Sequence, residues 1–284
     1  MDDGKRRQVA QVIDDQVVRA RRALLDALEA LGAHRDSIVL VGAQAIYVRT
    51  GSAEVSLAEF TTDGDLVVDS RRLGSDPLIE VAMEAGGFTH DSATRDPGVW
   101  ISRDGVHVDL MVPAAIAGKG RRGVDAPPHN RHAMRKSAGL EATLVSNSEF
   151  EIEAFDPSDA RRFQILVAGP AALLVAKLYK LYERIDEQRA VENKDAHDIY
   201  RLLVAIDTNV LVVELRRLLN DTVSAEVTAN ALEYLTELFS AGPDAPGSVM
   251  AGAAETGIGD PAFVAQSVSL LAADLSASLA PIPE

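Results

Sequence analysis

The chain has 284 residues, of which 47% are hydrophobic, and this is enough for two domains that each bury a core. It contains no cysteine, which excludes a disulfide framework, thiolate metal sites and a cysteine nucleophile. The formal net charge of −15 argues against a whole-surface affinity for nucleic acid, because phosphates would be repelled at long range.

Hydrophobic periodicity in the first part of the chain predicts a mixture of helices and strands. A long amphipathic helix is expected over 5–31 and ends at Gly32, and a buried strand over 37–41 follows. A short helix over 43–49 ends at Thr50-Gly51, and the stretch 52–60 is ambiguous. The further predicted elements are a strand over 62–69, a helix over 77–84, a hairpin of strands over 99–102 and 105–112, a loop over 117–138, and strands over 149–154 and 163–167.

From Pro170 onward the pattern becomes helical, and proline is favoured in the first turn of a helix. The predicted helices cover 171–189, 193–206, 210–220, 224–239 and 261–279, with a Gly- and Pro-rich mobile connection over 241–260. We therefore expect an α/β domain over 1–168 and a helical domain over 169–284. No apolar run of the roughly 18 to 20 residues that span a bilayer is evident, so a soluble, cytoplasmic protein without a membrane partner is expected.

Two aspartates mark the first candidate site, in the run Thr-Thr-Asp63-Gly-Asp65. Because a strand points alternate side chains to one face, Asp63 and Asp65 should face the same way. Two such carboxylates repel each other unless a cation lies between them, and a hard divalent ion is the usual one. Asp109, in the predicted hairpin, is a third candidate ligand. A D-x-D pair also occurs by chance on surface strands, but this one follows a glycine turn and precedes an apolar strand.

The glycine turn reads Gly42-Ala43-Gln44 and joins the first strand to the short helix. Glycine lets backbone amides approach a phosphate, and the helix that follows points its positive end at the same place. Arg49, one to two turns along that helix, either reaches a phosphate or is an ordinary surface arginine. Three carboxylates on adjacent strands beside such a turn form a layout that holds magnesium and a nucleoside triphosphate.

A basic segment over 119–136 interrupts the acidic chain, with Asp125 as its one acidic residue. This segment either docks a polyanion or is a solvated loop. Its cationic side chains are Lys119, Arg121, Arg122, Arg131, Arg135 and Lys136.

Three charged residues stand out in the helical part. Lys177 lies on an apolar helical stripe, where a lysine must extend its amine to water or meet an anion. Asp195 and Asp198 are three residues apart and share a helical face. A buried ion pair between Lys177 and Asp198, with Asp195 as a helix cap, is one explanation, and a functional site is the other. Lys180 and Arg184 are expected to be solvated.

The motifs of the first part resemble the nucleotidyltransferase superfamily with the polymerase-β-like palm. Among its members the chain looks most like the AbiEii-type and MenT-type toxins, over about residues 37–203. Those toxins carry a helical lysine, matched by Lys177, and then a (K/R/H)-D-x-x-D motif, matched from Lys194 to Asp198. The family has Gly-Gly or Gly-Ser where this chain has Gly42-Ala43, and this departure puts nucleotide affinity or choice in question.

The resemblance implies an α+β fold, with a mixed-sheet palm followed by a helical domain that closes over the nucleotide. It implies metal-dependent transfer of NMP from an NTP to a hydroxyl acceptor, with Mg²⁺ or Mn²⁺ as cofactor. RNA, as a tRNA 3′ end, is the expected acceptor, docked on the basic segment, and an antitoxin protein is an expected partner. By resemblance the metal ligands are Asp63, Asp65 and Asp109, the nucleotide contacts are Gly42, Ala43, Gln44, Arg49 and Lys177, and Asp198 orients the site or acts as a base.

Two other interpretations remain. The acceptor could be a small molecule such as an aminoglycoside, or a protein hydroxyl, and a cationic antibiotic suits the charge of −15 better than RNA does. The chain could also be a non-catalytic nucleotide- or partner-binding protein on a toxin scaffold, which the Ala43-Gln44 departure favours.

Overall fold

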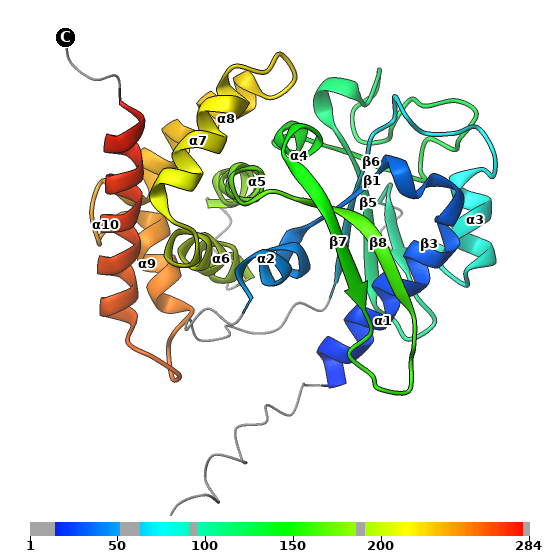
Figure 1. Cartoon of the computed structure of the whole chain (residues 1–284), viewed down its shortest axis with the longest axis horizontal. Helices are drawn as coiled ribbons and strands as arrows, with labels where there is room; N and C mark the ends of the chain where they lie inside the picture. Colours follow the sequence, from blue (N-terminus) through cyan, green and yellow to red (C-terminus); the bar gives the residue numbers. More distant parts are fainter. Residues whose placement is uncertain (1–14, 52–62, 91–95, 186–190, 281–284) are drawn as a thin grey trace, which may run out of the picture.

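The computed structural model describes residues 15–51, 63–90, 96–185 and 191–280 (Figure 1). Its first part is built on one mixed sheet of eight strands, in the order β3-β4-β5-β2-β1-β8-β7, with β6 also paired to β5. The central β1 runs antiparallel to β2 and parallel to β8, and β2 runs parallel to β5. The strands are β1 Ile38–Val41, β2 Gly64–Val68, β3 Thr89–His90, β4 Val99–Ile101, β5 His107–Pro113, β6 Arg135–Ser137, β7 Asn147–Glu153 and β8 Arg162–Ala168.

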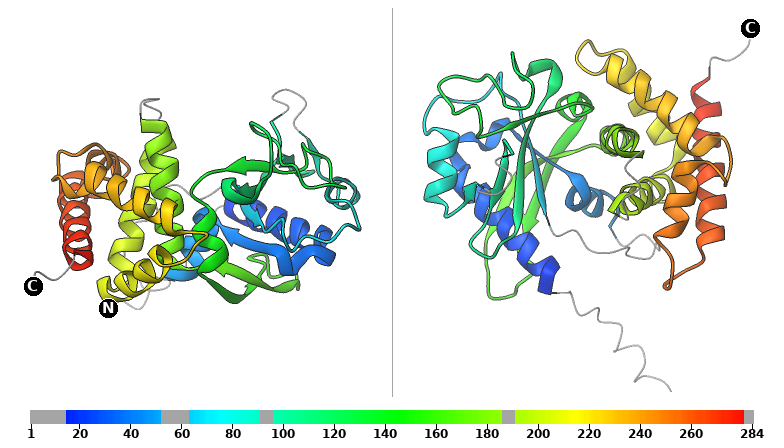
Figure 2. Two further views of the ribbon diagram at one scale, coloured as in Figure 1. Left: turned by 90° about the horizontal axis from the view of Figure 1, so that it is seen from above. Right: turned by 180° about the vertical axis from the view of Figure 1, so that it is seen from behind.

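The helices divide into two groups. α1 and α3 contact each other beside the sheet, while α5 to α10 gather on the opposite side of the molecule with α2 between (Figures 1 and 2). The helices are α1 Asp15–Ala30, α2 Gly42–Thr50, α3 Ile79–Ala85, α4 Glu141–Val145, α5 Pro170–Arg184, α6 Val191–Ala205, α7 Thr208–Leu219, α8 Ala225–Leu235, α9 Pro246–Ala253 and α10 Pro261–Leu279, with short turns η1 Gly32–Ser37, η2 Ala114–Ile116 and η4 Thr236–Ser240.

Local sequence explains the main elements. β1 is Ile-Val-Leu-Val, buried at every position, as a central strand covered on both faces must be. The edge strand β7 alternates polar and apolar residues, and only Ile152 in it is fully buried. α5 begins at Pro170, and α10 begins after Asp260, whose carboxylate caps the backbone amides of Ala262 and Phe263.

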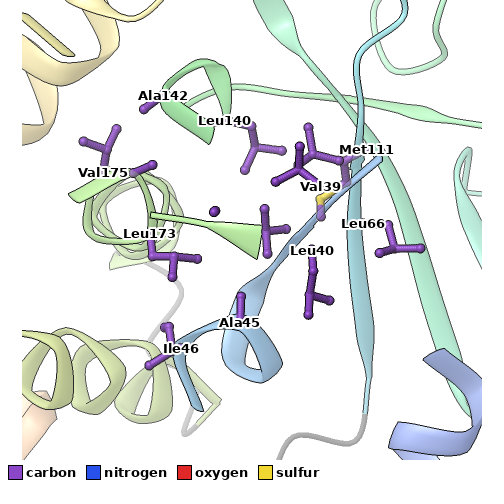
Figure 3. Packing of buried hydrophobic residues seen from close by; sticks show 14 of the residues in the cluster. Val39, Leu40, Ala45, Ile46, Leu66, Met111, Leu140, Ala142, Leu173 and Val175 are labelled. Carbon is purple, nitrogen blue, oxygen red and sulfur yellow. The ribbon is translucent and has the colours of Figure 1, made fainter. Parts of the chain in front are cut away.

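A single hydrophobic cluster runs from the sheet into the helices. Figure 3 shows Leu173 and Val175 of α5 in the same cluster as Val39 and Leu40 of β1, with residues of α2 and α4 around them. The helical part therefore packs on the sheet through a shared core, at the end of β1 that leads into α2.

The predicted mixed sheet followed by helices is confirmed, and so are the 99–112 hairpin and the strand pair β7–β8. Four predictions about elements were wrong. β2 begins at Gly64, so Asp63 lies in a bend just before it. The segment 117–138 contains a strand, β6, which pairs with β5, and α4 was not anticipated. The expected helix start before residue 15, the ambiguous stretch 52–60 and the end of the 171–189 helix lie outside the described residues.

The fourth error concerns 241–260, where a mobile connection was expected and α9 packs against α6 and α10. Its glycines are packing residues, since a Cβ on Gly247 would lie 2.6 Å from the ring of Phe239. A Cβ on Gly252 would lie 2.4 Å from the carbonyl oxygen of Pro261. Glycine here permits close helix packing rather than chain flexibility.

The expectation that no apolar run is long enough to span a membrane also needs correction. Among the described residues, α10 is long and apolar enough by length and composition alone. It packs along one side on α7, α9 and η4, and Val264, Val268 and Leu275 are buried there. That packing is typical of an outer helix in a bundle, so length and composition do not make it a membrane span.

Candidate active site

The candidate carboxylates lie at one edge of the sheet, where β1 leads into α2. Asp65 of β2 is paired in register with Val41 of β1 on one side and with Asp109 of β5 on the other. Asp63 precedes Asp65 by two residues. Asp65 and Asp109 are thus on adjacent strands, as expected, and Asp63 lies in the bend that leads into β2.

Gly42 starts α2 with φ +69°, a conformation that favours glycine. A Cβ at Gly42 would lie 2.0 Å from the Oδ2 atom of Asp65, so the Asp65 carboxylate occupies the space that any side chain would need. The predicted glycine turn is therefore present, and its lack of a side chain is required directly beside a candidate metal ligand.

Asp109 has an arginine partner. Arg135 of β6 donates from Nη2 to Oδ2 of Asp109 at 2.6 Å. Burial raises the pKa of Asp109, Arg135 lowers it in part, and the charges of Asp65 and Asp63 raise it again, with a net upward shift. The carboxylates therefore interact, although no three His, Asp or Glu side chains in the described part of the chain converge as a finished metal site.

A cavity of about 270 Å³ lies between these carboxylates and the helices α5 and α6. Its lining carries five acidic and five cationic side chains, so by formal charge it is neutral. The acidic residues are Asp63, Asp65, Asp109, Glu183 and Asp195, and the cationic residues are Arg135, Lys177, Lys180, Arg184 and Lys194. A neutral lining does not by itself compensate the charge of a triphosphate, so this site needs added cations to hold one.

Lys177 forms a buried ion-pair cluster with both aspartates of α6. Its Nζ lies 2.5 Å from Oδ1 of Asp195 and 2.6 Å from Oδ2 of Asp198, and the three side chains are between 3 and 7% exposed. Burial would lower the pKa of Lys177, but the two carboxylates outweigh it and raise that pKa. Burial would raise the pKa of Asp195, but Lys177 and Lys180 lower it to about 2. The expected pair of Lys177 with Asp198 is present, and Asp195 is a second partner instead of a helix cap.

Sequence reasoning missed two of the cations that line the cavity from the helices. Lys180 and Arg184 were expected to be solvated, yet both line the cavity, and Lys180 also contacts Asp195 at 3.2 Å. Lys194 lines it too, and burial lowers its pKa while the charges of Asp198 and Asp63 act in the opposite direction. Lys180 follows Lys177 by three residues and Arg184 follows Lys180 by four along α5, and this spacing was a signal that could have been used.

Arg49 is not placed at the cavity, contrary to its predicted reach to a phosphate. Its guanidinium donates to the carbonyl oxygens of Ala168 and Val167 and to the hydroxyl of Ser148. It also lies 4.4 Å from the ring centroid of Phe150. These contacts tie α2 to β7 and β8, because the side chain leaves α2 toward the sheet.

Gln44 is also absent from the cavity lining, and its side chain makes structural contacts instead. Its Nε2 donates to the backbone oxygen of Asp63 at 3.0 Å, and its Oε1 accepts from Nε of Arg21 at 2.9 Å. Arg21 in turn donates to the backbone oxygen of Glu153. Gln44 therefore fixes the backbone of a candidate metal ligand to α1 and β7, which no local pattern predicts.

The basic segment divides into two parts. Arg135 and Lys136 lie in β6, and the rest forms a loop over 119–134, called here the basic loop. Arg121, Arg122 and Arg131 line a separate hollow of about 740 Å³ in this loop. The loop is joined to the cavity side of the sheet because the backbone amide of Lys136 donates to the oxygen of Arg122 at 2.7 Å.

The structure thus brings most of the predicted residues to one cavity and leaves the others outside it. The residues that line the cavity are Gly42, Ala43, Asp63, Asp65, Asp109, Arg135 and Lys177. The predicted residues outside its lining are Gln44, Arg49, Asp198, Lys119, Arg121, Arg122 and Arg131.

Comparison with known protein families gives the matching evidence from sequence. The profile of a family described as Nucleotidyltransferase matches residues 19–224, which include the whole sheet and the cavity. The chain belongs to this nucleotidyltransferase family. It is therefore an enzyme of the transferase class, and the non-catalytic interpretation is not supported.

Other comparisons add little to the family assignment. No curated protein matches the sequence. A crystal structure described as a "putative nucleotidyltransferase from H. pylori" is similar over 94% of this chain and 97% of that chain, at 13% sequence identity. Its TM-score of 0.31 is too low to support an inference about the site.

Nucleotidyltransferases use an NTP and a divalent metal ion, and the residues at the cavity fit such an ion in three ways. Asp63, Asp65 and Asp109 offer hard oxygen donors, which Mg²⁺ and Mn²⁺ prefer. The charges of Asp65 and Asp63 raise the pKa of Asp109, as expected of three carboxylates that repel one another. The Asp65 carboxylate also lies in a space that stays open because residue 42 is a glycine.

Proposed function

We propose that this nucleotidyltransferase moves NMP from an NTP onto an RNA hydroxyl, that of a tRNA 3′ end, and uses Mg²⁺ or Mn²⁺. The proposal rests on the cavity lined by Asp65 and Asp109 of the sheet, by Asp63 in the bend before β2, and by lysines of α5 and α6. These carboxylates would hold divalent ions, which would supply charge neutralisation of the triphosphate and a more acidic attacking hydroxyl.

Metal binding and proton transfer are assigned to the carboxylates of the site. Asp63, Asp65 and Asp109 are the proposed metal ligands, and the Gly42 turn leaves the space that the Asp65 carboxylate occupies. In this proposal Asp109, whose pKa burial raises, would also accept the proton of the attacking hydroxyl while pyrophosphate leaves from the other side of the phosphorus. In this assignment the sheet supplies the chemistry and the helices supply the charge that holds the nucleotide.

Charge balance favours a specific set of phosphate contacts on the helices. Lys177 is compensated by two buried carboxylates, so its charge is already satisfied within the protein. Lys194 and Arg184 line the cavity and have no ion pair of comparable closeness among the described residues, and Lys180 is 41% exposed. We therefore assign triphosphate binding to Lys180, Arg184 and Lys194, and assign to Lys177 the task of holding α5 against α6.

Support for RNA as the acceptor comes from the basic loop. Arg121, Arg122 and Arg131 gather on one hollow, and Arg122 pairs with the half-exposed Asp96 at 3.2 Å. Phosphate contacts of this kind position a nucleic acid without reading its sequence. Because the chain as a whole carries −15, the proposed footprint on RNA is small and local.

A role as the toxin of a toxin–antitoxin or abortive-infection system extends this proposal. Its support is the resemblance to AbiEii-type and MenT-type toxins, which includes Lys177 and the Lys194-Asp195-x-x-Asp198 motif. In such a system the modified tRNA end would block translation, and an antitoxin protein would restrain the enzyme. A second candidate acceptor is a cationic small molecule of the aminoglycoside type, which the net charge of −15 favours.

The test is transfer of label from α-labelled NTPs by the purified chain with Mg²⁺ or Mn²⁺, offered tRNA, an aminoglycoside and a protein mixture in separate reactions. We expect label on tRNA, and a loss of about 10²-fold or more in Asp65→Asn, because a metal ligand is removed. Asp36→Asn is the matched control, since Asp36 is an exposed carboxylate in η1, at the other end of β1. Label on the aminoglycoside alone would reject RNA as acceptor, and equal turnover in Asp65→Asn would reject the site.

A further inference from the structure

Arg135 stands apart from the other cations of the basic segment, because it contacts a proposed catalytic carboxylate directly. We propose that Arg135 occupies the position of the metal cation at Asp109 in the metal-free enzyme, and that it exchanges with the ion for the same carboxylate oxygen. This makes Arg135 a positioning residue of the catalytic site rather than part of an RNA surface. The inference rests on the proposed role of Asp109 as a metal ligand.

The backbone places Arg135 for this contact. β6 runs parallel to β5, and Arg135 is paired in register with Met111, two residues beyond Asp109. Gly98 leaves the space that this approach needs, since a Cβ there would lie 2.5 Å from the backbone nitrogen of Arg135. The guanidinium then reaches Oδ2 of Asp109 at 2.6 Å, with the two side chains only 30% and 22% exposed.

The ion pair of Arg135 with Asp109 has one hydrogen bond, fewer than expected of an arginine that only neutralises a carboxylate. Arginine usually binds a carboxylate through two parallel hydrogen bonds. Here Nη2 alone donates to Asp109, and Nε of Arg135 is buried with no hydrogen-bond partner among the described residues. A buried donor without a partner costs free energy. The contact with Asp109 therefore leaves one donor of the guanidinium unsatisfied, which lowers the cost of giving this contact up.

Charge gives the reason for an exchange. Asp109 experiences the repulsion of Asp65 and Asp63, and Arg135 offsets part of it with a single positive charge. A divalent ion offsets the same repulsion with twice the charge, so the arginine and the ion compete for one site. Glu183 of α5 also feels the charge of Arg135, so the displaced guanidinium keeps an anionic neighbour.

The test measures Mn²⁺ binding by calorimetry on the full chain without nucleotide. We expect Arg135→Gln to bind Mn²⁺ about tenfold more tightly than the wild type, because the competing cation is gone. Without metal, Arg135→Gln should melt at a lower temperature than the wild type, since Asp109 loses its partner, and Mn²⁺ should raise its melting temperature by more than it raises that of the wild type. Arg162→Gln is the matched control, because Arg162 pairs with Glu151 and Glu153 at the far edge of the sheet.

The outcomes separate this inference from the function on which it rests. Unchanged or weaker Mn²⁺ binding in Arg135→Gln, with wild-type binding that is lost in Asp65→Asn, would overturn the exchange and leave the metal site intact. Wild-type Mn²⁺ binding that persists in Asp65→Asn would overturn the metal site itself, and the exchange with it. Arg135→Lys, which keeps one cation at this place, should show an affinity between those of the wild type and Arg135→Gln, and it serves as the test if the glutamine variant does not fold.

Discussion

Replacing Lys177 with methionine should destabilise the protein more than any other single change in the cavity. The substitution keeps the length and apolar contacts of the side chain but removes the charge between Asp195 and Asp198, which are 4% and 3% exposed. Removal of one partner from a buried ion pair costs about 3–5 kcal/mol, because the remaining charge is left in a medium that solvates it poorly.

The structure narrows this range. Asp195 keeps a second contact, to Lys180 at 3.2 Å, so Asp198 bears most of the loss. We therefore expect the lower end, about 3 kcal/mol, which corresponds to a fall in melting temperature of roughly 6–12 °C for a chain of this size. Lys180→Met is the matched control. Lys180 is 41% exposed, so its removal should cost less than about 1 kcal/mol.

The pH dependence gives a second measurement with a defined sign. In the wild type, burial opposes ionisation of Asp195, but Lys177 and Lys180 lower its pKa to about 2, below its value in an unfolded chain. This stabilisation is present at neutral pH and is lost as the pH falls through about 2. In Lys177→Met, burial should raise the pKa of Asp195 above its value in the unfolded chain. The stability deficit of the variant should then grow as the pH rises from about 4 to 7.

The assay is thermal or urea unfolding at pH 5 and pH 8, with and without NTP and Mg²⁺. Adding Asp198→Asn to Lys177→Met should recover part of the lost stability, since the stranded charge is removed. A Lys177→Met protein that melts like the wild type but no longer binds NTP would show that Lys177 binds the triphosphate, and that the structural assignment is wrong.

Three other perturbations test the site from different sides. Gly42→Ala should lower turnover by about 10²-fold with little change in circular dichroism, since its Cβ would displace the Asp65 carboxylate; wild-type turnover would contradict the close approach. Gln44→Met should raise the metal concentration for half-maximal turnover several-fold, because the backbone of Asp63 loses its hydrogen bond, and an unchanged metal requirement would argue against this role. Reversing the three arginines of the basic loop to glutamate should weaken RNA use and spare NTP binding, and raising salt from about 50 to 200 mM should mimic it; RNA use equal to the wild type would make the loop a solvated connection.

Periodicity and glycine placement were enough to predict most of the strands and the row of Asp65 and Asp109, but not β3 and β6. β2 and β5 are largely apolar runs bounded by turn residues, and Asp65 and Asp109 each lie within such a run. The Asp104-Gly105 turn likewise predicted the β4–β5 hairpin, and Gly105 has φ +76°. These are local signals, carried by residues within a few positions of one another.

The missed features depend on contacts between distant residues. The arginine at Asp109 comes from 26 residues away, and the hydrogen bonds of Gln44 join it to α1 and to the bend before β2. α9 was missed because Gly247 and Gly252 are poor helix formers, and only the neighbours that they pack against make them necessary. Propensity describes a segment alone, whereas these residues are explained by what lies against them.

The position of α2 affects how the protein unfolds. Its first residue forms the turn beside Asp65, and its last turn is held by the helical part, where Arg201 of α6 donates to Thr50 and to the carbonyl oxygen of Gly51. Arg49 holds the same helix to β8. Because α2 is held by contacts with both the sheet and the helical part, we expect the whole chain to unfold in one cooperative transition rather than two. A fragment that ends near residue 168 would leave the apolar side of α2 uncovered. The catalytic edge of the sheet would then lose the helix contacts that hold α2 in place.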